Sequence, residues 1–203
     1  MPRIVDKEEK RERILEAAIS VFAKKGTANT KMAEIAEAAE IGKGTLYEYF
    51  QNKEDILLSA FMYVLKKAEA DVSKKLAEVH EPLEKLTAYI LVWKDIMKSD
   101  FKDHVEIMLD IWAESIRHKE ETTAAGLNRI YRENRLLIKS ILDECLFQEK
   151  IHPVNTGIVA SIIIGVLDGL LLQWIMQPEI IDIDESLEEI AGLISRGLRI
   201  RER

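Results

Sequence analysis

The stretch from Thr30 to Phe50 reads TKMAEIAEAAEIGKGTLYEYF. The apolar residues of its first part, residues 32–39, recur three to four positions apart, which predicts a short amphipathic helix with Thr30 as its N-cap. Glu40 and Gly42 interrupt this pattern, and a second short helix is predicted over residues 43–50. Two short helices joined by a tight turn can place the second one in a DNA major groove, which is about 12 Å wide.

The predicted second helix has an inward and an outward face. Leu46 and Phe50 lie one helical turn apart and are expected to anchor the helix in the core. Lys43 and Tyr47 remain outside, where an ammonium and a phenol can bind phosphates and base edges. Gly44 allows the backbone to approach a phosphate closely, and the positive end of a helix favours an anion there.

This segment resembles the DNA-binding segment of the tetracycline-repressor (TetR) family, which reads approximately T-T-x-x-x-I-A-x-x-A-G-V-x-x-G-T-L-Y-x-Y/H-F-x-x-K-x-x-L. The matching residues are Thr30, Ile35, Ala36, Ala39, Gly44, Thr45, Leu46, Tyr47, Tyr49, Phe50 and Lys53, with Ile56 as a conservative match. Upstream residues that look like the family's first helix are Ala17, Ala18, Phe22 and Gly26. The specific resemblance covers residues 10–58, about a quarter of the chain, and the rest agrees only in length and helicity.

The resemblance implies a set of DNA contacts. Tyr49 and Lys53 are expected on the phosphate backbone, and Thr30 and Lys31 would touch the backbone at the start of the first short helix. Lys43, Thr45 and Tyr47 on the second short helix are candidates for contacts to base edges. The full expected set is Thr30, Lys31, Lys43, Gly44, Thr45, Tyr47, Tyr49 and Lys53.

The sequence departs from the family pattern in the turn and beside it. Lys31 replaces the second threonine, although a lysine there can still reach a phosphate. Glu40 stands where the family usually has glycine, and it costs about 1 kcal/mol if the turn requires a positive φ. Gly42 stands where a Ser or Thr cap is common, and Glu48 adds an acid that can accept a hydrogen bond from cytosine or point to solvent. These departures bear on operator sequence and affinity more than on fold.

Two features have a second interpretation. Tyr49 and Phe50 can both be ordinary core aromatic residues. This interpretation is favoured for Phe50 but not for Tyr49. The basic residues near the N-terminus alternate with acids, so an ordinary solvated helical face is favoured over an arm that binds DNA. These basic residues are Lys7, Lys10, Arg11 and Arg13.

Helical periodicity continues along the rest of the chain, which has only nine Gly and four Pro. The expected fold is all-α with about nine helices. Residues 1–52 would form a three-helix helix-turn-helix DNA-binding domain, and residues 53–203 a helical ligand-binding and dimerisation domain. Beyond the two short helices, the predicted helices cover residues 7–25, a long helix from residue 52 or 53, and residues 83–98, 103–116, 121–148, 155–177 and 185–201.

Composition constrains the class of protein. The net charge is −7, so DNA binding must rest on local features. Residues 1–55 hold ten basic against eleven acidic residues, which leaves the acidity mainly in the remainder. The lone cysteine, Cys145, cannot form an intrachain disulfide and is expected to be an inert buried thiol. A charged N-terminus without an apolar core is no signal peptide, and the expected localisation is cytoplasmic.

The apolar stretch over residues 157–176 could be mistaken for a membrane span. Asp168 interrupts it, and an acid at the bilayer centre would cost about 2.5–3.5 kcal/mol, so a fully buried helix is favoured and no membrane association is expected. Small residues recur on it at i+4 spacing, which permits close helix approach. With the last helix it predicts a four-helix dimer interface, as in TetR-like proteins, with an intrachain core as the alternative. The predicted interface residues are Gly157, Ser161, Ile162, Gly165, Gly169, Leu187, Ile190 and Ile194.

Aromatic and methionine side chains on the middle helices suit a bulky apolar ligand, although ordinary core is the alternative for any one of them. The candidate pocket residues are Tyr89, Trp93, Met97, Met108, Trp112, Asn128, Tyr131 and Trp174. Neither a cofactor nor a metal is expected.

The sequence therefore predicts a DNA-binding transcriptional regulator. The favoured version is a homodimeric repressor that a small, largely apolar ligand releases from a palindromic double-stranded operator. An activator is not distinguished from a repressor. A helical enzyme or carrier is the competing class, but the sequence has no nucleophile elbow, phosphate loop or HExxH pattern, and a carrier has no reason to display residues 44–47 with Lys53.

Overall fold

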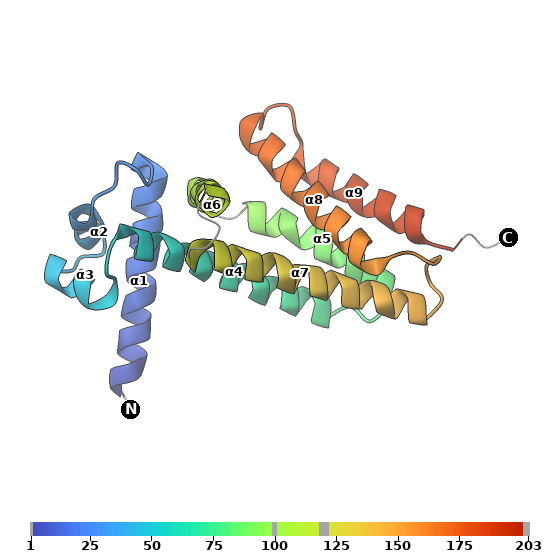
Figure 1. The fold of residues 1–203 in the computed structure, drawn as a ribbon, viewed down its shortest axis with the longest axis horizontal. Helices are drawn as coiled ribbons and strands as arrows, with labels where there is room; N and C mark the ends of the chain where they lie inside the picture. The colour runs from blue at the N-terminus through green and yellow to red at the C-terminus, as the bar shows by residue number, and fades with distance from the viewer. Residues whose placement is uncertain (1, 99–100, 118–121, 201–203) are drawn as a thin grey trace. The chain divides into compact units, whose positions relative to one another are not determined.

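The computed structural model describes residues 2–98, 101–117 and 122–200, and these form nine α-helices (Figure 1). The helices are α1 (Pro2–Lys25), α2 (Met32–Ala38), α3 (Lys43–Tyr49), α4 (Lys53–Ala77), α5 (Pro82–Lys98), α6 (Phe101–Arg117), α7 (Thr122–Phe147), α8 (Thr156–Met176) and α9 (Ile183–Leu198). Within the described ranges the only extended pairing is an antiparallel bridge between Ile151 and Arg199. The predicted all-α class is confirmed.

Capping residues set several of the helix starts. Asn155 and Asp182 precede α8 and α9, and each side chain accepts a hydrogen bond from the backbone N–H three residues on, at 3.1 and 3.0 Å. The Asp182 cap starts α9 two residues earlier than predicted. α1 begins at Pro2, five residues before the predicted start, with a proline in the first turn where it is tolerated.

The start of α2 differs from the prediction. Lys31 occupies the N-cap position, and the carboxylate of Glu34 accepts a hydrogen bond from its backbone N–H at 2.9 Å. Thr30 as the N-cap is wrong, because its hydroxyl donates instead to the carbonyl of Gly26 at 2.8 Å and its side chain is buried. The threonine therefore fastens the preceding turn rather than the helix.

The chain forms two compact units. The N-terminal unit contains α1, α2, α3 and α6, with α4 up to Ala68 and α7 up to Leu127. The C-terminal unit contains α5, α8, α9 and the remaining parts of α4 and α7. The division between the two compact units therefore differs from the expected domain boundary at residue 52, because α6 belongs to the same unit as the helix-turn-helix.

The core of the N-terminal unit forms around α1. The apolar stripe of this helix is buried, with Ile14, Leu15 and Phe22 at most 1% exposed. α1 packs against α2 and α6, and α2 packs against α3. On α6, Ile107 and Ile111 are each 1% exposed. Burying one such side chain stabilises the fold by roughly 1.5–3 kcal/mol, so α1 is fixed on two sides.

The core of the C-terminal unit forms where α9 packs against α5 and α8. Leu86 and Ile90 of α5, Leu142 of α7 and Leu187 of α9 are buried there. Cys145 is also buried, and burial raises the pKa of its thiol to about 11. Little thiolate therefore forms near neutral pH, which agrees with the expected inert cysteine.

α8 is long and apolar enough to cross a membrane by length and composition alone. One of its faces, which includes Ala160, Ile163 and Leu167, is buried within the C-terminal unit. Ile158 and Ile162 on another face are exposed, so a single chain does not bury the helix on all sides as expected.

Candidate functional site

α3 presents one face outward because the other is anchored in the core. Leu46 and Phe50 are 0% and 1% exposed, which confirms them as the inward face. Phe50 itself has extended backbone geometry, so α3 ends at Tyr49. Tyr47 is 49% exposed, and Lys43 is also exposed at the first turn. The helix therefore offers an ammonium and a phenol on a short rigid support.

The eight residues expected to bind DNA fall into three groups. Lys31, Lys43, Gly44 and Tyr47 are exposed. Those that are half-buried are Thr45, Tyr49 and Lys53. Thr30 is 3% exposed and bonded inside its own turn, so a phosphate contact through its side chain is wrong. The DNA contacts of the other seven stay predictions.

The turn between α2 and α3 contains a residue in the left-handed region. Glu40 has φ of 55°, which is the positive φ that the family's glycine would supply. Its backbone N–H donates to the Glu37 carbonyl at 3.0 Å, and the next N–H donates to the Ala36 carbonyl at 2.9 Å, so hydrogen bonds close the end of α2. The expected strain at Glu40 is therefore present.

Replacing Glu40 by glycine is expected to stabilise the protein by about 0.5–1 kcal/mol. The left-handed strain of about 1–2 kcal/mol is relieved, and part of the gain is lost to the greater freedom of glycine in the unfolded chain. Urea denaturation measures the change. Glu37→Gly, at an exposed position inside α2, is the matched control and is expected to destabilise by about 1 kcal/mol. Equal losses from both substitutions would show that Glu40 is unstrained.

Basic side chains of α1 contact the aromatic residues at the end of α3. The guanidinium of Arg11 lies 5.0 Å from the ring centroid of Phe50 and donates to the Ser59 hydroxyl of α4 at 2.9 Å. The ammonium of Lys7 lies 5.8 Å from the Tyr49 ring centroid. These contacts are cation–π interactions. The sequence pattern predicted either a solvated face or an arm that binds DNA for these basic residues. It did not predict that Lys7 and Arg11 contact the rings of Tyr49 and Phe50.

A polar cluster links three helices of the C-terminal unit. The Tyr89 hydroxyl of α5 donates to Asn134 of α7 at 2.8 Å, and the Tyr131 hydroxyl of α7 donates to the Asp168 carboxylate of α8 at 2.8 Å. Burial raises the pKa of Tyr89, and the nearby charge of Asp168 raises it further. Trp93 lies close enough to lower that pKa slightly, but its buried indole N–H meets no acceptor with hydrogen-bond geometry in the described residues.

The remaining pocket candidates are not all brought together. Trp174 is half-buried in the C-terminal unit, where Asn128 is exposed. Met108 and Trp112 are half-buried on α6 and belong to the N-terminal unit. The side chain of Met97 lies outside the described residues. Sequence reasoning missed Asp168 and Asn134 as polar partners, because their role depends on contacts between helices.

Asp168 gives the C-terminal unit a pH-dependent stability. Burial raises the pKa of this carboxyl, and the hydrogen bond from Tyr131 lowers it to a smaller degree. The native state thus favours the protonated acid. The stabilisation of the fold by Asp168 is therefore fully present below the unfolded pKa of about 4, and it is lost as the pH rises through the folded pKa.

Asp168→Asn, which stays neutral, is therefore expected to melt higher than the wild type at about pH 7.5. Each kcal/mol corresponds to about 2–4 °C for a chain of this size. The difference should shrink as the pH falls towards about 4, where both side chains are uncharged. Melting curves over this pH range make the comparison. A variant that is equally destabilised at every pH would contradict the assigned burial.

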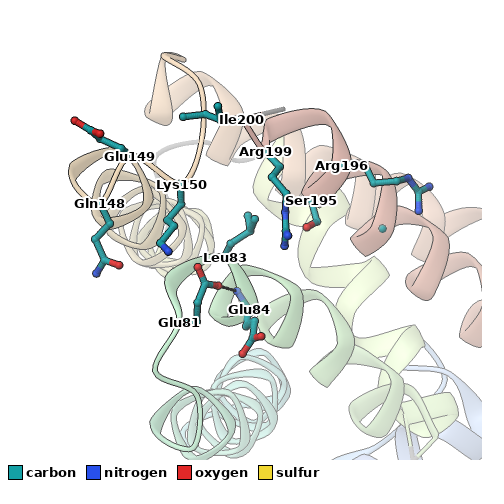
Figure 2. Close-up of a pocket in the computed structure, with 11 residues that line it drawn as sticks. Glu81, Leu83, Glu84, Gln148, Glu149, Lys150, Ser195, Arg196, Arg199 and Ile200 are labelled. Atoms are coloured by element: carbon teal, nitrogen blue, oxygen red, sulfur yellow. Dashed lines mark hydrogen bonds between the residues drawn. The ribbon is translucent and has the colours of Figure 1, made fainter. Parts of the chain in front are cut away.

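An open pocket of about 1300 Å³ lies where α5 begins and α9 ends (Figure 2). Figure 2 shows Lys150 and Arg199 pointing towards it, with Glu81 and Glu84 on the α5 side. None of the eight pocket candidates lines it. Its lining is charged, in contrast to the apolar ligand pocket that the sequence predicts.

α8 leaves an apolar face uncovered in the single chain. Ile158 and Ile162 are 59% and 57% exposed. A Cβ added at Gly165 or Gly169 would meet nothing within 4 Å, so the space beside this face is open. Leu193 of α9 is also exposed. Apolar surface of this kind usually marks an interaction site.

The other residues predicted at the dimer interface differ in how far they are buried within the single chain. Ser161 is exposed and accepts a hydrogen bond from Arg135 at 2.9 Å, while Gly157, Ile190 and Ile194 are half-buried. Leu187 is 0% exposed inside its own chain, which makes its assignment to a dimer interface wrong. Leu187 thus lies on the side of α9 that packs against its own chain.

Comparison with known proteins places these features in a family. Residues 14–60 match the description "Bacterial regulatory proteins, tetR family", and residues 82–198 match "BetI-type transcriptional repressor, C-terminal". The chain is similar to the fatty acid metabolism regulator protein of Bacillus subtilis, with 23% identity over 186 residues that cover 91% of this chain and 93% of that protein.

Solved structures agree with this relationship. The fatty acid degradation regulator FadR from Bacillus halodurans superposes with a TM-score of 0.77 at 25% identity, covering 93% of this chain and 99% of that one. FadR from Bacillus subtilis in complex with stearoyl-CoA gives a TM-score of 0.77 at 24% identity, over 93% and 99% of the two chains. The BetI-type match alone spans more than half of the sequence. The chain belongs to the TetR family of bacterial transcriptional regulators.

Proposed function

We propose that this TetR-family regulator is a cytoplasmic homodimeric repressor, and that it acts by binding a palindromic operator rather than by catalysis. The observation that carries the proposal is the outward face of α3, where Lys43 and Tyr47 are exposed while Leu46 and Phe50 are buried. A helix held in this way can enter a major groove with its side chains towards the base edges.

The uncovered face of α8 supports the dimer. Ile158, Ile162 and the open space beside Gly165 form a surface on which the same face of a second copy can pack around a two-fold axis. A two-fold dimer carries two copies of α3, and these match a palindrome when they lie about 34–36 Å apart.

The effector that we propose is largely apolar and carries one hydrogen-bond acceptor. Aromatic rings of Tyr89, Trp93 and Tyr131 gather around the polar cluster of the C-terminal unit. A buried indole N–H without an acceptor is costly, and a ligand carbonyl beside Trp93 would satisfy it. The acyl chain and thioester carbonyl of a long-chain acyl-CoA have both features, and the Bacillus subtilis relative was crystallised with stearoyl-CoA.

An operator selected from random duplex DNA, followed by titration with stearoyl-CoA, tests both parts. We expect salt-sensitive binding to the selected DNA, because phosphate contacts release counterions. Stearoyl-CoA should raise the melting temperature and release the DNA, whereas CoA without the acyl chain should do neither. Choline, as a small cation, is expected to have no effect.

The two parts fail separately. If no duplex is enriched and binding to all DNA is absent, the repressor proposal is wrong. If DNA binds but acyl-CoA neither stabilises the protein nor releases the operator, only the effector class is wrong. Trp93→Phe should weaken stearoyl-CoA binding without changing operator affinity, because it removes the N–H and keeps an aromatic ring.

A further inference from the structure

The turn between α1 and α2 is bonded to two helices outside the helix-turn-helix. Gly26, with φ of 75°, ends α1. The hydroxyl of Thr27 then donates to the carboxylate of Asp110 on α6. The carbonyl of Thr27 accepts a hydrogen bond from the Lys53 ammonium of α4 at 2.8 Å, and Lys53 also donates to the Ala28 carbonyl at 3.3 Å. α4 and α6 therefore meet at one residue of the turn.

Both bonds of Thr27 involve a charged partner. Such hydrogen bonds are roughly twice as strong as neutral ones. Asp110 is half-buried, and Ile107 and Ile111 beside it are buried, so the carboxylate stands on a fixed part of α6.

The position of Thr27 sets the start of α2. Its carbonyl also accepts from the N–H of Thr30 at 3.3 Å, and the buried Thr30 hydroxyl closes the same turn on Gly26. α2 begins two residues later and packs against α3. A displacement of Thr27 therefore moves the support of the helix that carries Lys43 and Tyr47.

We propose that Thr27, Asp110 and Lys53 form a clamp that holds the helix-turn-helix in its DNA-binding arrangement, so that loss of the Thr27–Asp110 bond lowers operator affinity. This inference rests on the proposed repressor function. Thr27 and Asp110 are positioning residues and need not touch DNA.

Operator affinities of Thr27→Val, Asp110→Leu and the double variant test the clamp, because leucine leaves no acceptor for the Thr27 hydroxyl. Each single variant should bind the selected operator about tenfold more weakly, and the double variant no more weakly than either, because both remove one bond. Thr27→Ser keeps the hydroxyl and should bind as the wild type does. Thr87→Val is the matched control, since this hydroxyl donates to the Leu83 carbonyl of its own helix in the C-terminal unit.

Hydrogen exchange of the DNA-free variants gives a second measurement. Amides of α2 and α3 should exchange about tenfold faster in Thr27→Val and Asp110→Leu, while those of α8 and α9 stay unchanged. Wild-type affinity in both single variants, independent losses that add in the double variant, or unchanged exchange in α2 would overturn the clamp. If the wild type binds no DNA, the exchange measurement still decides for or against the clamp, so the two proposals fail separately.

Discussion

Replacing Tyr47 by alanine is expected to weaken specific operator binding by about 1–3 kcal/mol per half-site. Tyr47 is 49% exposed on α3 and lies between Leu46, which anchors the helix, and Glu48, which is exposed. Its removal takes a ring and a hydroxyl from the outward face and leaves the anchor intact. Fluorescence anisotropy with the selected operator at fixed salt measures the loss, and the melting temperature should stay within about 1 °C because surface substitutions rarely change stability.

The control for Tyr47 is another exposed aromatic residue. Phe147, at the end of α7 in the C-terminal unit, is 89% exposed, and Phe147→Ala should leave operator affinity unchanged. Tyr47→Phe separates the contribution of the hydroxyl from that of the ring. Wild-type affinity in Tyr47→Ala, or an equal loss in Phe147→Ala, would contradict the assignment of Tyr47 to the DNA-binding face.

Gly165→Leu is expected to weaken dimerisation by about 1–3 kcal/mol, through overpacking of a close helix contact. Gly165 lies on the face of α8 that also exposes Ile158 and Ile162. In the single chain an added Cβ at this position meets nothing within 4 Å, so the monomer can accept the leucine. A loss seen by sedimentation equilibrium therefore reports on the partner subunit.

Two further variants make the dimer test specific. Gly165→Ala should have a smaller effect in the same direction, because the added volume is smaller. Ala77→Leu adds a large side chain at an exposed position near the end of α4 and should leave the dimer unchanged. If Gly165→Leu sediments as the wild type does, α8 is not the contact, and a wholly monomeric wild type would remove the two-fold arrangement altogether.

Local sequence patterns predicted most of the fold. The i, i+4 pair of Leu46 and Phe50 identified the inward side of α3, because helical periodicity is carried by neighbouring residues. The same holds for Glu40, whose positive φ follows from the turn that the family's glycine usually occupies. Helix bounds moved by a few residues where caps such as Asp182 decide the start.

Contacts between distant segments could not be predicted in the same way. Nothing near Thr27 in sequence indicates that Asp110 accepts its hydroxyl, and nothing near residue 52 indicates that α6 folds with α1. Leu187 was assigned to a dimer surface because an apolar repeat does not say which side of α9 faces its own chain. These features depend on tertiary packing, which one sequence without a structure does not encode locally.

A hydroxyl-radical footprint of the full chain on its selected operator shows whether paired α3 helices read the DNA. Two copies of α3 in neighbouring turns of the major groove should protect two patches on one face of the duplex, with centres about 10 base pairs apart. Tyr47→Ala should weaken both patches equally. One protected patch, or patches that persist at full strength in Tyr47→Ala, would contradict the claim that paired α3 helices read the operator.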